Sequence, residues 1–252
     1  MFTWIKGGAL KASPILFGTL LAACGGGGGN SSSDTNASET NVKLAPGGYA
    51  TGIVYGDGST EEAITLLSPT GKFVTVVYLD SITVGTLQFG SDGSISGSGT
   101  DVTFDSSWET INGTLTGKTL TSGTATITAG IAGVENKVTL ERDHQYSDLG
   151  ITMSALTGTY SMSDPEVYPT TVTVAEDGTI TGSDTTGCAF NGSVSIPDTK
   201  YNVFEVSYKA SNCADSLRNG QFFGLGAYDP ELMELEFAGT DREVTAVFIG
   251  TK

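Results

Sequence analysis

The chain of 252 residues has a single histidine and three cysteines, so the side chains that build most hydrolytic and metal sites are scarce. The histidine, His144, stands beside Asp143 in a polar run, where a solvated surface position is favoured over the role of a catalytic base. The sequence has no His-Glu-x-x-His pair, no Gly-rich loop ending in Lys-Ser/Thr, and no Gly-x-Ser-x-Gly turn between a strand and a helix. We therefore expect a non-enzymatic protein with no cofactor and no metal.

Cations are also few, because 12 Lys and Arg stand against 28 Asp and Glu, for a formal net charge of -16. Binding to nucleic acid requires clustered cations that contact phosphates, which excludes nucleic acid as a partner. The acidic residues are scattered along the chain, which favours a role in solubility. The alternative is that the acidic surface binds a cationic protein partner. The aspartates in Asp-Gly turns lack the long acidic loop of a calcium site.

The N-terminal residues 1–23 have three parts that are typical of a secretory signal: a basic start, a short apolar stretch and small residues at the exit. The apolar stretch is too short to span a bilayer of ~30 Å as a helix. Leu21-Ala22-Ala23-Cys24 resembles the lipobox of bacterial lipoproteins. The resemblance implies that residues 1–23 are removed and that Cys24 carries acyl chains such as palmitate. The alternative is an ordinary signal whose apolar run contains a cysteine.

The segment 24–46 reads as a lipidated cysteine followed by a flexible tether, since five glycines and a run of Ser, Thr and Asn cannot bury apolar surface. Gly25 follows Cys24 in place of aspartate. By resemblance to enterobacterial sorting rules, this implies the outer membrane, with a periplasmic or cell-surface orientation left open.

If Cys24 carries lipid, Cys188 and Cys213 remain as an even pair. In an exported protein such a pair predicts a disulfide. The alternative, a metal pair, lacks further ligands because His144 is far along the chain. The disulfide is therefore the favoured interpretation.

Strand signals dominate the rest of the chain. Phe204, Val206 and Tyr208 alternate with more polar residues, which indicates strands with one buried face. Glu234 and Glu236 are predicted to share the wet face of another strand, which disfavours their use as a glycosidase carboxylate pair. Asx-Gly pairs predict tight hairpin turns at residues 57–58, 92–93, 112–113, 177–178 and 191–192.

Residues 92–104 align with residues 177–190, which favours a domain duplication; the alternative is that Gly/Thr-rich hairpins look alike by chance. About eight strands in each half, with short connections, predict an all-β fold of two tandem small antiparallel β-barrels over 47–142 and 157–252. A β-sandwich is the alternative. Residues 143–156 break the strand pattern and are predicted to form a linker with one helical turn. Polar residues at the outward positions favour soluble domains over a barrel that spans a membrane.

Four aromatic residues are candidates for binding. Trp108 follows a short polar run, Tyr168 lies in a proline-bounded loop, and Phe222 and Phe223 are adjacent, so that one of the two faces outward on a strand. Exposed aromatic residues mark interfaces or ligand mouths. The plainer alternative is packing at a barrel end or against the other domain.

The second half also carries Gly187-Cys188, Asn212-Cys213 and a Gly-x-x-x-Gly strand from Gly220 to Gly224. In these features it looks like uncharacterised lipoproteins of Gram-negative bacteria, which bring no established function. A lipid-tethered pair of barrels is similar in architecture to surface lipoproteins of the transferrin-binding and factor H-binding kind. Fold analogy does not fix function.

The sequence thus predicts an outer-membrane lipoprotein, anchored through Cys24, with a non-enzymatic binding or envelope-interaction role. Two alternatives stay open. The first is a periplasmic carrier of small ligands, of lipocalin-like type, which requires a cavity inside at least one barrel. The second is an inhibitor of a cationic enzyme such as lysozyme.

Overall fold

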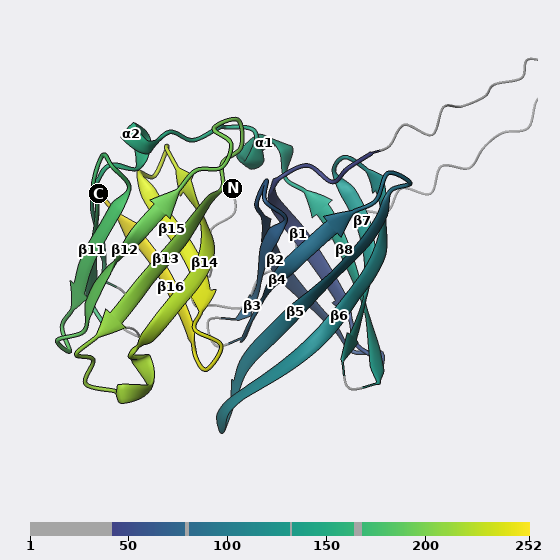
Figure 1. Ribbon diagram of the computed structural model, residues 1–252, viewed down its shortest axis with the longest axis horizontal. Coiled ribbons are helices and arrows are strands. Elements are labelled where there is room, and N and C mark those ends of the chain that lie inside the picture. Colours follow the sequence, from purple (N-terminus) through teal and green to yellow (C-terminus); the bar gives the residue numbers. More distant parts are fainter. Residues whose placement is uncertain (1–41, 79–80, 132, 164–167) are drawn as a thin grey trace, which may run out of the picture.

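The computed structural model describes residues 42–78, 81–131, 133–163 and 168–252, which form two closed antiparallel β-barrels in tandem (Figure 1). The predicted fold class is confirmed, and the sandwich alternative is wrong because each sheet closes on itself. The export signal, Cys24 and most of the tether lie outside the described residues. Within the described part of the chain, no helix has the length and apolar character needed to cross a membrane.

In the first barrel each strand pairs with the next one along the chain, and β8 closes the barrel on β1. Gly58 and Gly93 adopt positive φ angles of 86° and 79° in hairpin turns, as Asp-Gly pairs favour. The strands described in this barrel are β1 (Gly47–Val54), β2 (Thr60–Leu67), β3 (Lys72–Tyr78), β4 (Ser81–Phe89), β5 (Ser94–Asp105), β6 (Ser107–Thr121), β7 (Thr124–Ile131) and β8 (Val134–Arg142).

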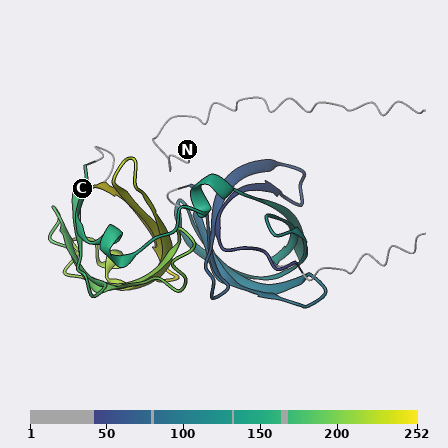
Figure 2. The same cartoon turned by 90° about the horizontal axis from the view of Figure 1, so that it is seen from above.

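The second barrel has the same up-and-down order, and β16 meets β9 through the pair Thr251 and Ser161. Seen from above, the two barrels are closed rings that lie side by side (Figure 2). The strands described here are β9 (Gly158–Met162), β10 (Thr170–Val174), β11 (Thr179–Asp184), β12 (Ala189–Ser195), β13 (Phe204–Ser211), β14 (Gly220–Asp229), β15 (Glu234–Thr240) and β16 (Thr245–Thr251). A short 3₁₀ helix, η1 (Ser216–Arg218), lies between β13 and β14.

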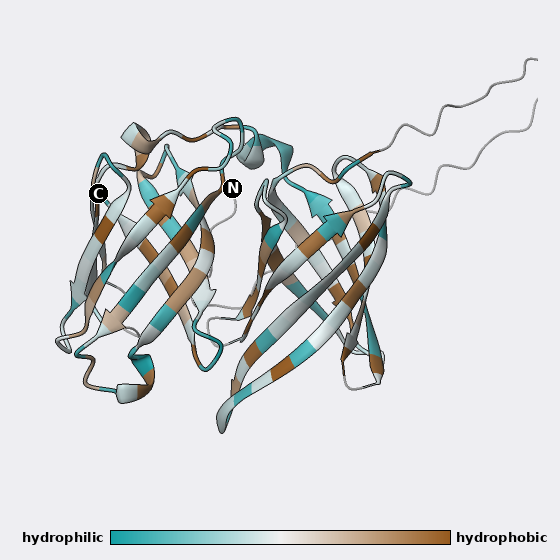
Figure 3. Ribbon diagram, viewed as in Figure 1, coloured by the Kyte–Doolittle hydropathy of each residue, from teal (hydrophilic) through white to brown (hydrophobic). Residues whose placement is uncertain are grey.

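Hydrophobic and hydrophilic residues alternate along many strands, as Figure 3 shows. On β13, Phe204, Val206 and Tyr208 are buried inside the second barrel, as their spacing predicts. Successive side chains of a strand point to opposite faces, so a closed barrel places every second residue in its lumen. The sequence pattern therefore determines which residues line each interior.

The linker contains two short helices, α1 (His144–Ser147) and α2 (Met153–Leu156), where one helical turn is predicted. Both lie at the upper end of the molecule in Figure 1. At this end a fully buried tyrosine anchors the first strand of each barrel. Tyr49 donates its hydroxyl to the carbonyl of Ala45, and Tyr160 donates to that of Leu156 at 2.8 Å. This shared contact supports a relationship between the two halves.

An apolar interface joins the barrels. Strands β2, β3 and β4 of the first barrel pack against β14 and β15 of the second. Leu66, Val74 and Ile82 belong to one buried cluster with Leu225 and Ala238. Burial of such side chains stabilises by about 25 cal/mol per Å². The outward faces of these strands are therefore part of a core that the two barrels share.

A long hairpin of the first barrel reaches the second. Strands β5 and β6 have 12 and 15 residues, and they extend beyond the barrel at its lower end in Figure 1. The Thr110 hydroxyl donates to the carbonyl of Arg242 at 2.7 Å, and Trp108 packs against the core of the second barrel. Trp108 is thus half-buried and packs against the other domain, so the packing alternative holds for this residue and not the exposed binding role.

Two sequence interpretations are wrong in detail. The Asn-Gly pairs 112–113 and 191–192 lie inside β6 and β12 and not in turns. A Cβ on Gly192 would lie 2.1 Å from the carbonyl oxygen of Ser207, so only glycine allows the two strands to approach this closely.

The two aligned segments of the sequence place their Asp-Gly turns at different points of the two barrels. Gly93 lies between the fourth and fifth strands of its barrel, whereas Gly178 lies between the second and third. Similar Gly/Thr hairpins produce this alignment locally.

The predicted wet face of β15 is also wrong. Glu234 and Glu236 are 8% and 2% exposed, because the outward face of β15 is covered at the barrel–barrel interface. The alternation itself is correct, since Leu235 and Phe237 point into the barrel. Period two identifies the two faces of a strand, but it does not reveal that a second domain covers the outer one.

Candidate functional site

The second barrel contains a cavity of about 270 Å³ that is open to solvent on one side and walled by aromatic rings. Tyr208 stacks on Phe222 with ring centroids 5.2 Å apart, and Phe237 stacks on Phe248 at 5.1 Å. Phe190 meets Tyr208 edge-on at 5.8 Å. Five consecutive strands, β12 to β16, thus each supply one ring to the wall of this cavity. Such rings offer large apolar area and favour stacked or edge-on partners.

A single arginine stands among the residues that line this cavity. Arg218 ends η1 at the lower end of the barrel, and its side chain is 28% exposed. Its Nη2 lies 2.6 Å from Oδ2 of Asp184, whose side chain is fully buried, and its guanidinium carbon lies 5.1 Å from the Tyr168 ring centroid. An arginine has five N–H donors. The contacts to Asp184 and Thr186 occupy two of these donors among the described residues, which leaves others for a ligand.

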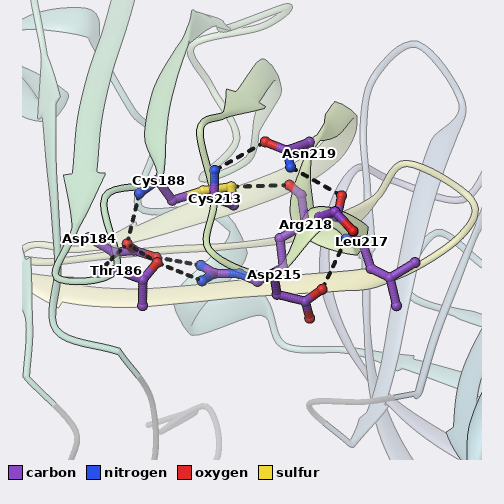
Figure 4. Close-up of a disulfide and its surroundings, with 9 residues drawn as sticks. Asp184, Thr186, Cys188, Cys213, Asp215, Leu217, Arg218 and Asn219 are labelled. Atoms are coloured by element: carbon purple, nitrogen blue, oxygen red, sulfur yellow. Dashed lines mark hydrogen bonds and ion pairs between the residues drawn. A yellow bond between two sulfur atoms is a disulfide. The ribbon is translucent and has the colours of Figure 1, made fainter.

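The predicted disulfide lies at the mouth of this cavity, where Arg218 and Asp184 form their ion pair. Cys188 and Cys213 are bonded, which joins the turn before β12 to the loop before β14 (Figure 4). The Cys188 amide donates to Oδ1 of Asp184 at 3.1 Å, and the Sγ of Cys213 lies 3.5 Å from the Arg218 carbonyl oxygen. Each partner of the Arg218–Asp184 ion pair is therefore tied to one half of the disulfide.

The ionisation states at the mouth follow from these contacts. Burial alone would raise the pKa of Asp184, but hydrogen bonds from Thr186 and Arg218 outweigh it and hold the pKa below its ordinary value. Burial raises the pKa of Tyr208, so its phenol stays neutral. The site therefore presents a charged donor, Arg218, at the mouth of a cavity whose aromatic wall is uncharged.

The first barrel holds a smaller cavity of about 140 Å³. Its wall is mainly aliphatic and includes Ile53, Leu115 and Ile127. Asp101 lines it and accepts a hydrogen bond from Thr83 at 2.7 Å. Burial raises the pKa of Asp101, and this hydrogen bond partly offsets the shift.

The structure brings only some of the predicted binding residues together. Phe222 and Tyr168 line the second cavity. Phe223 is 58% exposed on the outside, so the prediction that one of the adjacent phenylalanines faces outward is confirmed. Trp108 packs on the second barrel without lining its cavity. His144 is exposed in α1, where it lies near Asp148.

Sequence reasoning missed the polar residues of both lumens. Arg218 stands five residues after Cys213, in a chain with few cations, and this was the available signal. Nothing in the sequence separates Asp101 from the other scattered aspartates, because its importance depends on which way β5 faces. Among the described residues, no cluster of three or more His, Cys, Asp or Glu side chains could hold a metal ion.

Comparisons with known proteins do not add to this description. No protein-family model matches the chain, and no match was found among curated proteins or solved structures.

Proposed function

We propose that this chain is a lipid-anchored, non-enzymatic binding protein of the cell envelope that takes up a small aromatic molecule in the lumen of its second barrel. The observation that carries the proposal is the ring of aromatic side chains around a cavity with Arg218 at its mouth. Ligand pockets are typically concave and mostly apolar, with a few placed polar groups. The carrier alternative required a cavity in at least one barrel, and both barrels have one.

The cavity limits the size and chemistry of this ligand. Its volume of about 270 Å³ lies just under the usual lower bound of about 300 Å³ for small-molecule sites. A molecule of two fused rings is therefore a suitable size. Arg218 only donates hydrogen bonds, so the polar end of the ligand must accept them, as a carboxylate or carbonyl does.

The anchor and the outer-membrane location rest on the sequence and on two supporting facts. A structural disulfide, Cys188–Cys213, suits an oxidising compartment outside the cytosol. The described chain begins at Val42, at the end of the first barrel where Tyr49 is buried (Figure 1). Arg218 lies at the opposite end of its own barrel. A tether attached before Val42 would thus leave the binding mouth facing away from the membrane.

Isothermal titration calorimetry of the purified chain with 2-naphthoate tests the binding proposal. We expect saturable binding to one site. Ala246→Phe places a ring in the lumen and should weaken binding at least about tenfold, because the ligand and the new ring compete for one volume. Ala175→Phe is the matched control, since Ala175 is exposed in the turn before β11. The absence of binding to the wild-type chain, or equal binding to Ala246→Phe, overturns the proposal.

Metabolic labelling with palmitate tests the anchor separately. We expect label in the wild-type chain and its loss in Cys24→Ser, whereas Cys188→Ser should keep it. Label that survives in Cys24→Ser contradicts lipidation at this residue.

A further inference from the structure

The lumen of the first barrel differs from that of the second in both size and wall chemistry. Its volume of about 140 Å³ is close to that of an apolar cavity of about 150 Å³ known to hold benzene. Aliphatic side chains such as Ile53, Leu115 and Ile127 replace the aromatic ring system of the second barrel. This lumen is therefore suited to one ring or a short alkyl chain, and not to a fused ring system.

Its charged lining residue is Asp101. One carboxylate oxygen accepts from the Thr83 hydroxyl, and none of the ion pairs among the described residues involves Asp101. A nearby phenol is already committed, because Tyr55 donates to Oε2 of Glu61 at 2.6 Å. A partly buried carboxylate without a cation is costly unless a partner neutralises it. The lumen thus provides an apolar volume beside an acceptor that lacks a cationic partner.

We propose that the lumen of the first barrel is a second binding site, selective for a small apolar molecule that carries a protonated amine. The amine would donate to Asp101 while the apolar part fills the space between Ile53, Leu115 and Ile127. Charge-assisted hydrogen bonds of this kind are about twice as strong as neutral ones. This site goes beyond the proposed function and does not depend on it.

The two lumens then select opposite chemistry. Arg218 at the second lumen requires a ligand that accepts hydrogen bonds, whereas the carboxylate of Asp101 suits a ligand that donates them. The two cavities also differ in size, since the second has a volume of about 270 Å³ and the first about 140 Å³. Two tandem barrels with different lumens would thus bind two classes of small molecule on one chain.

Methyl NMR of the full chain with benzylamine as the probe tests this site. Ile53, Leu115 and Ile127 report on the first lumen, and Ile180 and Val172 report on the second. We expect benzylamine to shift the first set saturably and to leave the second set unchanged. Benzyl alcohol, which has the same ring without the charge, should bind at least about tenfold more weakly.

Two variants locate the effect. Asp101→Asn keeps the shape and removes the charge, and should weaken benzylamine binding at least about tenfold. Asp105→Asn is the matched control on the same strand, because Asp105 is exposed at the hairpin tip. Both methyl spectra show directly whether the variants fold. Unchanged binding to Asp101→Asn, or the absence of shifts at the first-lumen methyls, overturns the inference.

A filled lumen separates this inference from the proposed function. Ala129→Phe occupies the first cavity and should abolish benzylamine binding while 2-naphthoate binding in the second barrel persists. If benzylamine binds and 2-naphthoate does not, only the proposed function fails. If 2-naphthoate binds and benzylamine does not, only the second site fails.

Discussion

Replacing Glu236 by glutamine should remove a large part of the pH dependence of stability. Glu236 is 2% exposed on β15 at the barrel–barrel interface, and its Oε2 has no hydrogen-bond partner among the described residues. Burial, followed by a hydrogen bond to Glu234 and repulsion from Glu234 and Asp229, raises the pKa of Glu236 from 4.5 to about 10. The phenol of Tyr146 is the other titratable group near it, and burial raises the pKa of that phenol as well.

The sign of the effect follows from proton binding. Between pH 4.5 and about 10 the folded state keeps a proton on Glu236 that the unfolded chain releases. The free energy of unfolding therefore falls as pH rises through this window, by at most about 1.4 kcal/mol per pH unit. From pH 5 to pH 8 the contribution of this one group is at most about 4 kcal/mol. Below pH 4.5 both states are protonated and the contribution is constant.

Urea denaturation at pH 5 and pH 8 measures this difference. We expect the wild-type chain to lose stability over the interval, and Glu236→Gln, which is neutral throughout, to lose much less. Glu243→Gln is the matched control, since Glu243 is exposed in the turn between β15 and β16. Equal pH dependence in the wild-type chain and in Glu236→Gln would refute the assignment of a retained proton to Glu236.

Three further predictions concern the second barrel. Replacing Cys188 and Cys213 together by serine should lower the free energy of unfolding by about 3 kcal/mol, measured by urea denaturation, because the disulfide closes a loop with a sequence separation of 25; no change would contradict a stabilising bond. Arg218→Lys should weaken 2-naphthoate binding about tenfold in calorimetry, since lysine lacks the planar fork that binds carboxylates; unchanged affinity would remove Arg218 from the site. Trp108→Ala should destabilise the protein by about 1–3 kcal/mol in thermal unfolding, because half-buried packing on the second barrel is lost; a neutral result would mean that the long hairpin adds no stability.

Local pattern predicted the strands well. Alternation on β13 placed Phe204, Val206 and Tyr208 on one face, and closure of the sheet turned that face into a lumen. Asp-Gly turns were correct where the glycine has a positive φ, as at Gly58 and Gly93. These features depend on interactions within a few residues or between adjacent strands, which a single sequence encodes directly.

The features that failed depend on contacts between distant parts of the chain. The burial of Glu234 and Glu236 requires the first barrel, which the pattern of β15 does not contain. The lumen polar groups were missed for the same reason: Arg218 and Asp184 are separated by 34 residues and meet only in the closed barrel, where the disulfide joins the segments that carry them. The prediction for the aromatic candidates was correct in part. Phe222 and Phe223 point to opposite faces of β14 as expected, but no local signal in the sequence says which of the two lines a cavity.

The central claim is that the lumen of the second barrel binds an aromatic ligand, and intermolecular nuclear Overhauser effects from 2-naphthoate test it most directly. Phe222 and Phe223 provide an internal control, because the first lines the cavity and the second is 58% exposed outside it. We predict contacts from the naphthoate protons to the rings of Phe222, Tyr208 and Phe248, with none to Phe223. Contacts to Phe223 without any to Phe222 would place the ligand on the outer surface and contradict the account.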